Sequence, residues 1–162
     1  MTLANLKTNA MRILDKAGIP YKTYGYDHKD GLVDGISVAS KIGQPVEKVY
    51  KTLVTQGTSK EYYVFIIPVD SELDLKAAAK AVGEKAVVMI KVADINKITG
   101  YIRGGCSPIG MKKEYKTVLD SSCSTLDAMI VSAGKIGYQI ELKPQDLAGL
   151  LDCKLENVII QK

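Results

Sequence analysis

Two glycine-rich segments are the first residues of this sequence whose types and spacing could do chemistry. They are GGCSPIG at residues 104–110 and SAGKIG at residues 132–137. Glycine lets the backbone approach a ligand closely, and backbone N–H groups can stabilise a developing oxyanion. Both segments could instead be ordinary tight turns, so the residue types alone leave two interpretations open.

Lys51 is the next candidate, because alternation in the predicted strand KTLVT places it on the same face as Leu53. A lysine among apolar residues either extends along a sheet edge towards water or points into a pocket. The segment KKEYK at residues 112–116 follows the first glycine-rich segment. Its composition is typical of a solvated surface, while its position also makes it a candidate contact for phosphate.

Several common kinds of catalytic site are disfavoured. The single histidine, His28, follows Asp27 in a polar loop, so a Ser-His-Asp or Cys-His arrangement would depend on it alone. Cys106, Cys123 and Cys153 lack the C-x-x-C spacing of zinc and thioredoxin-like sites. We interpret them as small side chains of a reduced protein, with redox chemistry as the alternative. We expect neither a metal nor a cofactor.

Composition is that of a globular protein, with 46% hydrophobic residues in a chain of 162. This length is enough for one domain with a sizeable core, and we expect a single domain over residues 1–162. The sequence lacks a secretory pattern at its start and the run of about 20 apolar residues that spans a membrane. We therefore expect a cytoplasmic location and no membrane partner.

The formal net charge of +4 permits a polyanionic partner without establishing one. Lysine supplies nearly all of the positive charge, and it contacts phosphate as a point charge. If nucleic acid binds, we expect contacts to its backbone rather than groove reading of sequence, and no DNA partner.

Helices that could position these segments are predicted from capping and amphipathic spacing. One covers residues 9–17, and another follows the cap Asp74 and ends before Gly83. Ser37 is predicted to cap a short helix, and Pro144 to open the last one.

Short apolar segments between the helices predict strands. They lie at residues 21–26, 51–55, 62–69, 86–90, 101–103, 117–119, 128–132 and 138–142. Many short strands with few helices argue against a doubly wound parallel sheet. We predict an α/β (α+β) fold with a mixed, barrel-like sheet flanked by helices.

Five segments occur in the order found in a known family. They are YDH at 26–28, VYKTLV at 49–54, LDLKAAAKAVG at 73–83, TGYIRGGCSPIG at 99–110 and VSAGKIGYQIEL at 131–142. Together they resemble the YbaK/EbsC family of aminoacyl-tRNA deacylases, close to the Cys-tRNA(Pro) and Cys-tRNA(Cys) deacylase group. The resemblance implies a fold related to the editing domain of bacterial prolyl-tRNA synthetases. It also implies trans editing, the removal of a wrong amino acid from a charged tRNA after the synthetase releases it.

The resemblance places the family's key lysine at Lys51, and we assign the oxyanion contact to Gly105 and neighbouring N–H groups. Further candidates for the substrate site are Tyr26, Thr52, Gly104, Ser107, Pro108, Gly110, Ser132, Gly134, Gly137 and Gln139. Candidate tRNA contacts are Lys112, Lys113 and Lys116. Gln139 departs from the aspartate that is frequent in the family, and a neutral amide cannot act as a base or balance an ammonium as a carboxylate does.

The implied reaction is cleavage of the ester between cysteine and tRNA(Pro), with tRNA(Cys) as a further substrate candidate. For a cysteinyl substrate the family pattern implies attack by the substrate's own thiol, whereas alanine would require attack by a bound water. The alternatives are therefore a deacylase for another substrate such as Ala-tRNA(Pro), or a non-catalytic module that binds tRNA or a synthetase. Because the net charge is modest, we expect prolyl-tRNA synthetase to help present the substrate.

Overall fold

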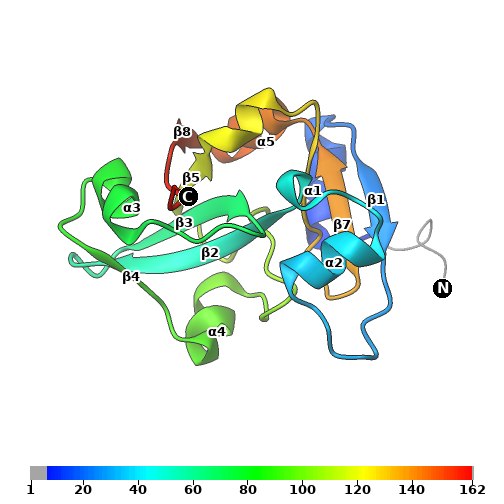
Figure 1. Cartoon of the computed structure of the whole chain (residues 1–162), viewed down its shortest axis with the longest axis horizontal. Coiled ribbons are helices and arrows are strands. Elements are labelled where there is room, and N and C mark those ends of the chain that lie inside the picture. The colour runs from blue at the N-terminus through cyan, green and yellow to red at the C-terminus, as the bar shows by residue number, and fades with distance from the viewer. Residues whose placement is uncertain (1–6, 162) are drawn as a thin grey trace.

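The computed structural model describes residues 7–161, which form two β-sheets with helices around them (Figure 1). The helices are α1 (Asn9–Ala17), α2 (Gly35–Lys41), the 3₁₀ helix η2 (Val46–Lys48), α3 (Leu75–Val82), the 3₁₀ helix η3 (Val92–Asp94), α4 (Ile95–Thr99), the 3₁₀ helix η4 (Ser121–Thr125) and α5 (Pro144–Leu151). The strands are β1 (Lys22–Gly25), β2 (Tyr50–Gly57), β3 (Tyr62–Pro68), β4 (Val87–Met89), β5 (Lys116–Asp120), β6 (Met129–Ser132), β7 (Tyr138–Leu142) and β8 (Lys154–Glu156). The predicted domain of residues 1–162 extends at both ends beyond the described residues.

The larger sheet has the strand order β4-β2-β3-β5-β8 and is mixed, since β3-β5 and β5-β8 are parallel and its other pairs antiparallel. The smaller sheet, β1-β7-β6, is antiparallel and lies on the right in Figure 1. The predicted α+β fold with a mixed sheet is confirmed.

The predicted barrel-like shape overstates how far the sheets close, because the two sheets do not form a closed barrel. They meet at an isolated bridge between Val49 and Ile130. Closure would require a continuous ladder between β2 and β6. Beyond the bridge, residues of both strands line a pocket instead.

The hydrophobic core has two main clusters because β3 buries both of its faces, as the continuous apolar run YYVFIIP indicates. Val64 and Ile66 join the cluster that contains Met11 and Leu14 of α1. Phe65, on the opposite face, joins the cluster that contains residues of α3. The larger sheet is thereby held between helices, which fixes the position of its neighbour β2.

Several predicted helix ends are confirmed by the capping contacts. Thr8 accepts from the N–H of Met11 at the start of α1, and Asp74 accepts from the first turn of α3. Gly18 and Gly83 adopt the left-handed conformation at the ends of these helices, with φ of 72° and 73°.

Two local predictions are wrong. Asp34, not Ser37, caps α2, because the Asp34 carboxylate accepts from the Ser37 N–H at 3.1 Å. Residues 101–103 form a loop rather than a strand, because Gly100 ends α4 with φ of 85° and the Gly105 N–H then donates to Ile102. The helix α4 and the strand β8 were not predicted.

No helix within residues 7–161 combines the length and apolar character needed to cross a membrane.

Replacing Asp120 tests how the C-terminal segment is attached. The Asp120 side chain is 1% exposed and accepts from the Val158 N–H at 2.9 Å and the Ser122 N–H at 3.1 Å. Asp120→Ala removes both acceptors and should lower the free energy of unfolding by about 2–4 kcal/mol. Urea denaturation measures this change, and Asp127→Ala, at an exposed position, is the matched control. Equal stability of the two variants would contradict the role given to Asp120.

Candidate functional site

A pocket of about 770 Å³ lies between the two sheets. Residues 49–53 of β2 and its approach form one wall, and Ser132 of β6 and Gln139 of β7 form another. The start of α2, the preceding loop, Val69 and the three residues Arg103, Gly104 and Cys106 complete the lining. The volume is within the range of small-molecule sites, so the pocket can admit the end of a substrate.

The pocket exists because one edge of β2 is open. A bridge from Val49 to Ile130 occupies this edge at one end, and the Val54 carbonyl accepts from the Ile90 N–H at 3.2 Å at the other. Main-chain groups alternate in direction along an antiparallel strand, so those of Thr52 face the same edge as those of Val54. The backbone of Thr52 is therefore presented to the pocket.

Lys51 is half-buried in the pocket lining, and its Nζ has neither a hydrogen-bond partner nor an ion pair among residues 7–161. Loss of hydration lowers the pKa of the Lys51 ammonium below its usual 10.5, while the negative charges of Glu72 and Asp70 oppose the shift. This unpaired cation is available to a substrate oxygen or phosphate. The structure thus places Lys51 in a pocket rather than along a solvated edge.

Neutral polar side chains lie near Lys51 in the lining. Ser132 and Gln139 are register partners on neighbouring strands, so their side chains share one face of the smaller sheet. The Thr52 Oγ1 is buried without a hydrogen-bond partner in the described part of the chain. These groups offer hydroxyl and amide contacts to a bound molecule without adding a charge.

The first glycine-rich segment reaches the pocket through Gly104 and Cys106. Gly105 does not line it, and its N–H donates to the Ile102 carbonyl at 3.0 Å. Within residues 7–161 the N–H groups of Gly104 and Cys106 have no hydrogen-bond acceptor. The oxyanion contact that we assigned to Gly105 and its neighbours therefore fits the two flanking residues better than Gly105 itself.

The two glycine-rich segments pack against each other, which explains two of the glycines. A Cβ on Gly105 would lie 3.1 Å from the Ile136 nitrogen. A Cβ on Gly104 would lie 2.9 Å from the Val33 side chain, and φ of Gly104 is 86°. A larger residue at either position would push apart the elements that form the pocket wall.

The other predicted substrate residues lie outside the lining. Ser107 is fully buried and accepts from the Ile109 N–H, and the Tyr26 hydroxyl is buried without a partner in the described chain. Gly110 and Gly134 pack against the Tyr101 side chain. The candidates that do not line the pocket are Tyr26, Gly105, Ser107, Pro108, Gly110, Gly134 and Gly137.

The predicted tRNA contacts Lys112, Lys113 and Lys116 are exposed and lie outside the pocket. His28 is also exposed, next to Gly137, and does not line the pocket. The described residues contain no cluster of three or more His, Cys, Asp or Glu side chains placed to hold a metal ion.

Arg103, which lines the pocket and precedes the glycine pair, was not predicted as a site residue. A signal was available in the sequence, because arginine binds carboxylates and phosphates and the adjacent glycines allow the backbone N–H groups to approach an anion. Asp34 is the carboxylate of the lining, and both of its oxygens contact Ser37. Lys51 and Arg103 thus give the lining two cationic side chains that an anionic group of a ligand can contact.

Cys106 also lines the pocket, but its thiol is a poor nucleophile at neutral pH. Burial raises the pKa of the Cys106 thiol to about 11, so the thiol is protonated at neutral pH. The pocket accordingly offers cations, backbone donors and neutral hydroxyls rather than a strong protein nucleophile.

The sequence that forms this fold is that of an aminoacyl-tRNA editing domain. The aminoacyl-tRNA editing domain family matches residues 34–150, and the chain belongs to this family. It is 46% identical over 144 residues to EbsC of Enterococcus faecalis, named as a proposed Cys-tRNA(Pro)/Cys-tRNA(Cys) deacylase, covering 89% of this chain and 88% of the relative. The predicted family is thereby confirmed.

Solved structures show the same fold at low sequence identity. A crystal structure described as a proposed trans-editing enzyme for prolyl-tRNA synthetase superposes with a TM-score of 0.81 at 19% identity, covering 96% of this chain and all of the other. The hypothetical protein APE2540 superposes with a TM-score of 0.84 at 17% identity, covering 92% of this chain and 97% of the other.

The charge state of Lys51 can be tested by NMR with isotope-labelled lysine. A lowered pKa means that the ammonium loses its proton at a lower pH than an ordinary lysine, so the titration midpoint should fall below 10.5. Leu53→Asn admits water beside Lys51 and should move the midpoint back upward, because loss of hydration is the main cause of the shift. A midpoint at or above 10.5 in the unmodified protein would refute the burial argument.

Proposed function

We propose that this protein removes mischarged cysteine from tRNA(Pro) by cleaving the aminoacyl ester, with Cys-tRNA(Cys) as a second substrate. The observation that carries the proposal is a pocket lined by two cationic side chains, in which the Lys51 ammonium and the N–H groups of Gly104 and Cys106 have no partner within residues 7–161. The name of the Enterococcus faecalis relative supports the choice of substrate. We further propose a cytoplasmic protein of one domain that receives its substrate with the help of prolyl-tRNA synthetase.

In the proposed reaction the substrate's thiol sulfur attacks the ester carbonyl carbon. A sulfur–carbon bond forms, the carbon–oxygen bond to the terminal ribose breaks, and the thiol proton ends on the ribose oxygen. The products are a cyclic thioester of cysteine and tRNA with a free hydroxyl. The protonated state of Cys106 supports a mechanism in which the substrate provides the nucleophile.

The described residues suggest roles in this step. The N–H groups of Gly104 and Cys106 stabilise the oxyanion, because they line the pocket and have no acceptor within residues 7–161. Lys51 holds the leaving ribose oxygen or the terminal phosphate. Arg103 provides a second positive charge in the pocket, while the exposed Lys112, Lys113 and Lys116 contact the tRNA backbone.

A second candidate function is cleavage of Ala-tRNA(Pro) with a bound water as the nucleophile. The buried, unpartnered Thr52 hydroxyl favours this alternative, because it lies in the same lining as Ser132 and Gln139. Together these side chains could hold a water molecule by hydrogen bonds. The two functions differ in whether the reaction needs a thiol on the substrate.

The substitution Lys51→Ala tests whether the positive charge of Lys51 contributes to the proposed reaction. We expect kcat/KM for Cys-tRNA(Pro) to fall by at least about 100-fold, or about 2.7 kcal/mol, because the substrate loses its charged partner in a partly desolvated site. Lys80→Ala, which removes an exposed lysine of α3 that does not line the pocket, is the charge-matched control. Circular dichroism of both variants verifies folding, and a folded Lys51→Ala protein with the wild-type rate would exclude the proposed role.

The choice of nucleophile is tested with cysteinyl-, alanyl-, seryl- and prolyl-tRNA(Pro) at equal enzyme concentration. Cysteine should be released at least about tenfold faster than alanine, or about 1.4 kcal/mol, because alanine has no side-chain nucleophile. Serine should also react slowly, since a hydroxyl is a weaker nucleophile than a thiol near neutral pH. Equal rates for cysteine and alanine would instead support the water mechanism, and no release with any substrate would support a non-catalytic binding module.

A further inference from the structure

The loop of residues 27–34, between β1 and α2, forms one wall of the pocket. Gly31, Val33 and Asp34 of this loop line the cavity. The Val33 side chain lies directly against Gly104, so the loop also contacts the segment that carries the candidate oxyanion donors. The position of this loop therefore sets the width of the pocket on that side.

Hydrogen bonds within the loop give it shape without attaching it to another element. The side chain of Asp27 accepts from the Lys29 N–H, and that of Asp30 from the Leu32 N–H, each at 3.0 Å. The Gly31 N–H donates to the His28 carbonyl at 3.1 Å. All of these contacts join residues that are close in sequence, so the loop could still move as a unit.

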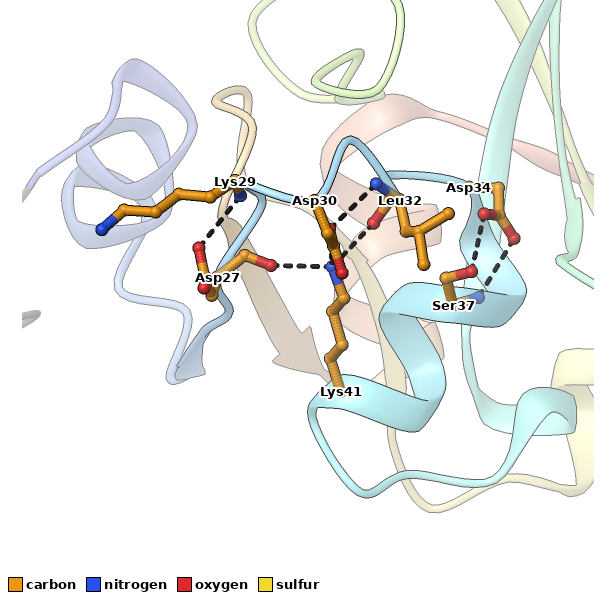
Figure 2. A network of polar contacts seen from close by, with 7 residues as sticks. All are labelled: Asp27, Lys29, Asp30, Leu32, Asp34, Ser37 and Lys41. Carbon is orange, nitrogen blue, oxygen red and sulfur yellow. Dashed lines mark hydrogen bonds and ion pairs between the residues drawn. The ribbon is translucent and has the colours of Figure 1, made fainter.

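Lys41, the last residue of α2, attaches the loop to the helix (Figure 2). Its Nζ donates to the Asp27 carbonyl and the Asp30 carboxylate, both at 2.7 Å, and to the Leu32 carbonyl at 2.9 Å. An ammonium has three donors, and these three acceptors use all of them. The same Nζ lies 5.8 Å from the centre of the Tyr26 ring, at the start of the loop.

The loop of residues 27–34 is thus held by contacts at both the start and the end of α2. Asp34 caps the start of α2 through Ser37, and Lys41 reaches back from its end. The ion pair with Asp30 is partly exposed and contributes little by itself. The two hydrogen bonds to carbonyl groups orient the loop, because they require its backbone to face the end of α2.

We propose that Lys41 is a positioning residue for substrate binding: it holds residues 27–34 against Gly104 and so fixes one wall of the pocket. The inference rests on the proposed deacylase function for its effect on activity, while the attachment of the loop can be measured without any substrate. Lys41 does not line the pocket, so its effect is exerted through the loop. Its replacement should therefore weaken binding of the aminoacyl end and leave the chemical step nearly unchanged.

The test compares Lys41→Gln, Lys41→Arg and Lys29→Gln. The Lys29 side chain points away from the network in Figure 2 and has no hydrogen bond or ion pair in the described chain, so Lys29→Gln removes the same charge from the same region. Arginine keeps the charge and several donors, but its planar geometry fits three convergent acceptors less well than an ammonium does. Steady-state deacylation of Cys-tRNA(Pro) gives KM and kcat, and hydrogen exchange measures protection of residues 27–34.

We expect Lys41→Gln to raise KM about tenfold with kcat changed less than about threefold, and to increase exchange in residues 27–34. Lys41→Arg should recover part of both effects, and Lys29→Gln should stay within about twofold of the wild type. If Lys41→Gln does not fold, Lys41→Arg and Asp30→Ala, which removes the side-chain acceptor, provide the same comparison at smaller amplitude.

Wild-type exchange in the Lys41→Gln loop would overturn the inference whatever the activity. A lowered kcat with unchanged KM would also overturn it, as would equal effects of Lys29→Gln and Lys41→Gln, which would indicate general charge attraction to RNA. If the wild-type protein cleaves no aminoacyl-tRNA, the proposed function fails. Hydrogen exchange then still decides whether Lys41 holds the loop.

Discussion

Along the second edge of β2, main-chain pairing in the described chain stops after the bridge from Val49 to Ile130 and resumes where Val54 accepts from Ile90. Backbone N–H and C=O groups that are withdrawn from water need partners, and a strand edge left open inside a protein is therefore uncommon. Here the open edge faces a cavity, and Thr52 presents its main chain there. The pocket, the separation of the two sheets and the half-burial of Lys51 all follow from this interruption.

Glycines keep the facing wall close to this edge. The segments around Gly104 and Gly134 approach each other and the Tyr101 ring at distances that leave little room for a Cβ. Close backbone approach brings main-chain donors into the lining without intervening side chains, which suits the recognition of a carbonyl oxygen. The site is consequently made largely of backbone and neutral groups, with positive charge supplied by Lys51 and Arg103 and negative charge by Asp34.

Helix ends and strand faces could be predicted where the local sequence offers a single candidate for each position. Asp74 and Gly83 bound α3 as their types suggest, and alternation correctly placed Lys51 on the face of Leu53, where it points into a pocket. The cap of α2 was mistaken because Asp34 and Ser37 are both good capping residues, three positions apart. Only the geometry decides that the aspartate accepts from the serine.

Features that depend on distant pairing could not be predicted from local patterns. The loop at residues 101–103 has the composition of a strand, but Gly100 turns the chain and no neighbouring strand accepts it among the described elements. The open edge of β2 and the engagement of the Gly105 N–H likewise depend on where other segments lie. The resemblance to a family identified the correct segments, but only the structure separates residues that line the pocket from those that support it.

The parallel pairs of the larger sheet also impose an order on the formation of the protein. The hairpin of β2 and β3 is local in sequence, whereas β5 pairs with residues 63–66 and then with β8 near the end of the chain. During synthesis the hairpin can form early, but one edge of β5 stays uncovered until residues 154–156 of β8 have emerged and paired with it. A nascent chain that stalls between β5 and β8 therefore exposes an apolar strand edge, and pairing with β8 is what removes this aggregation-prone surface.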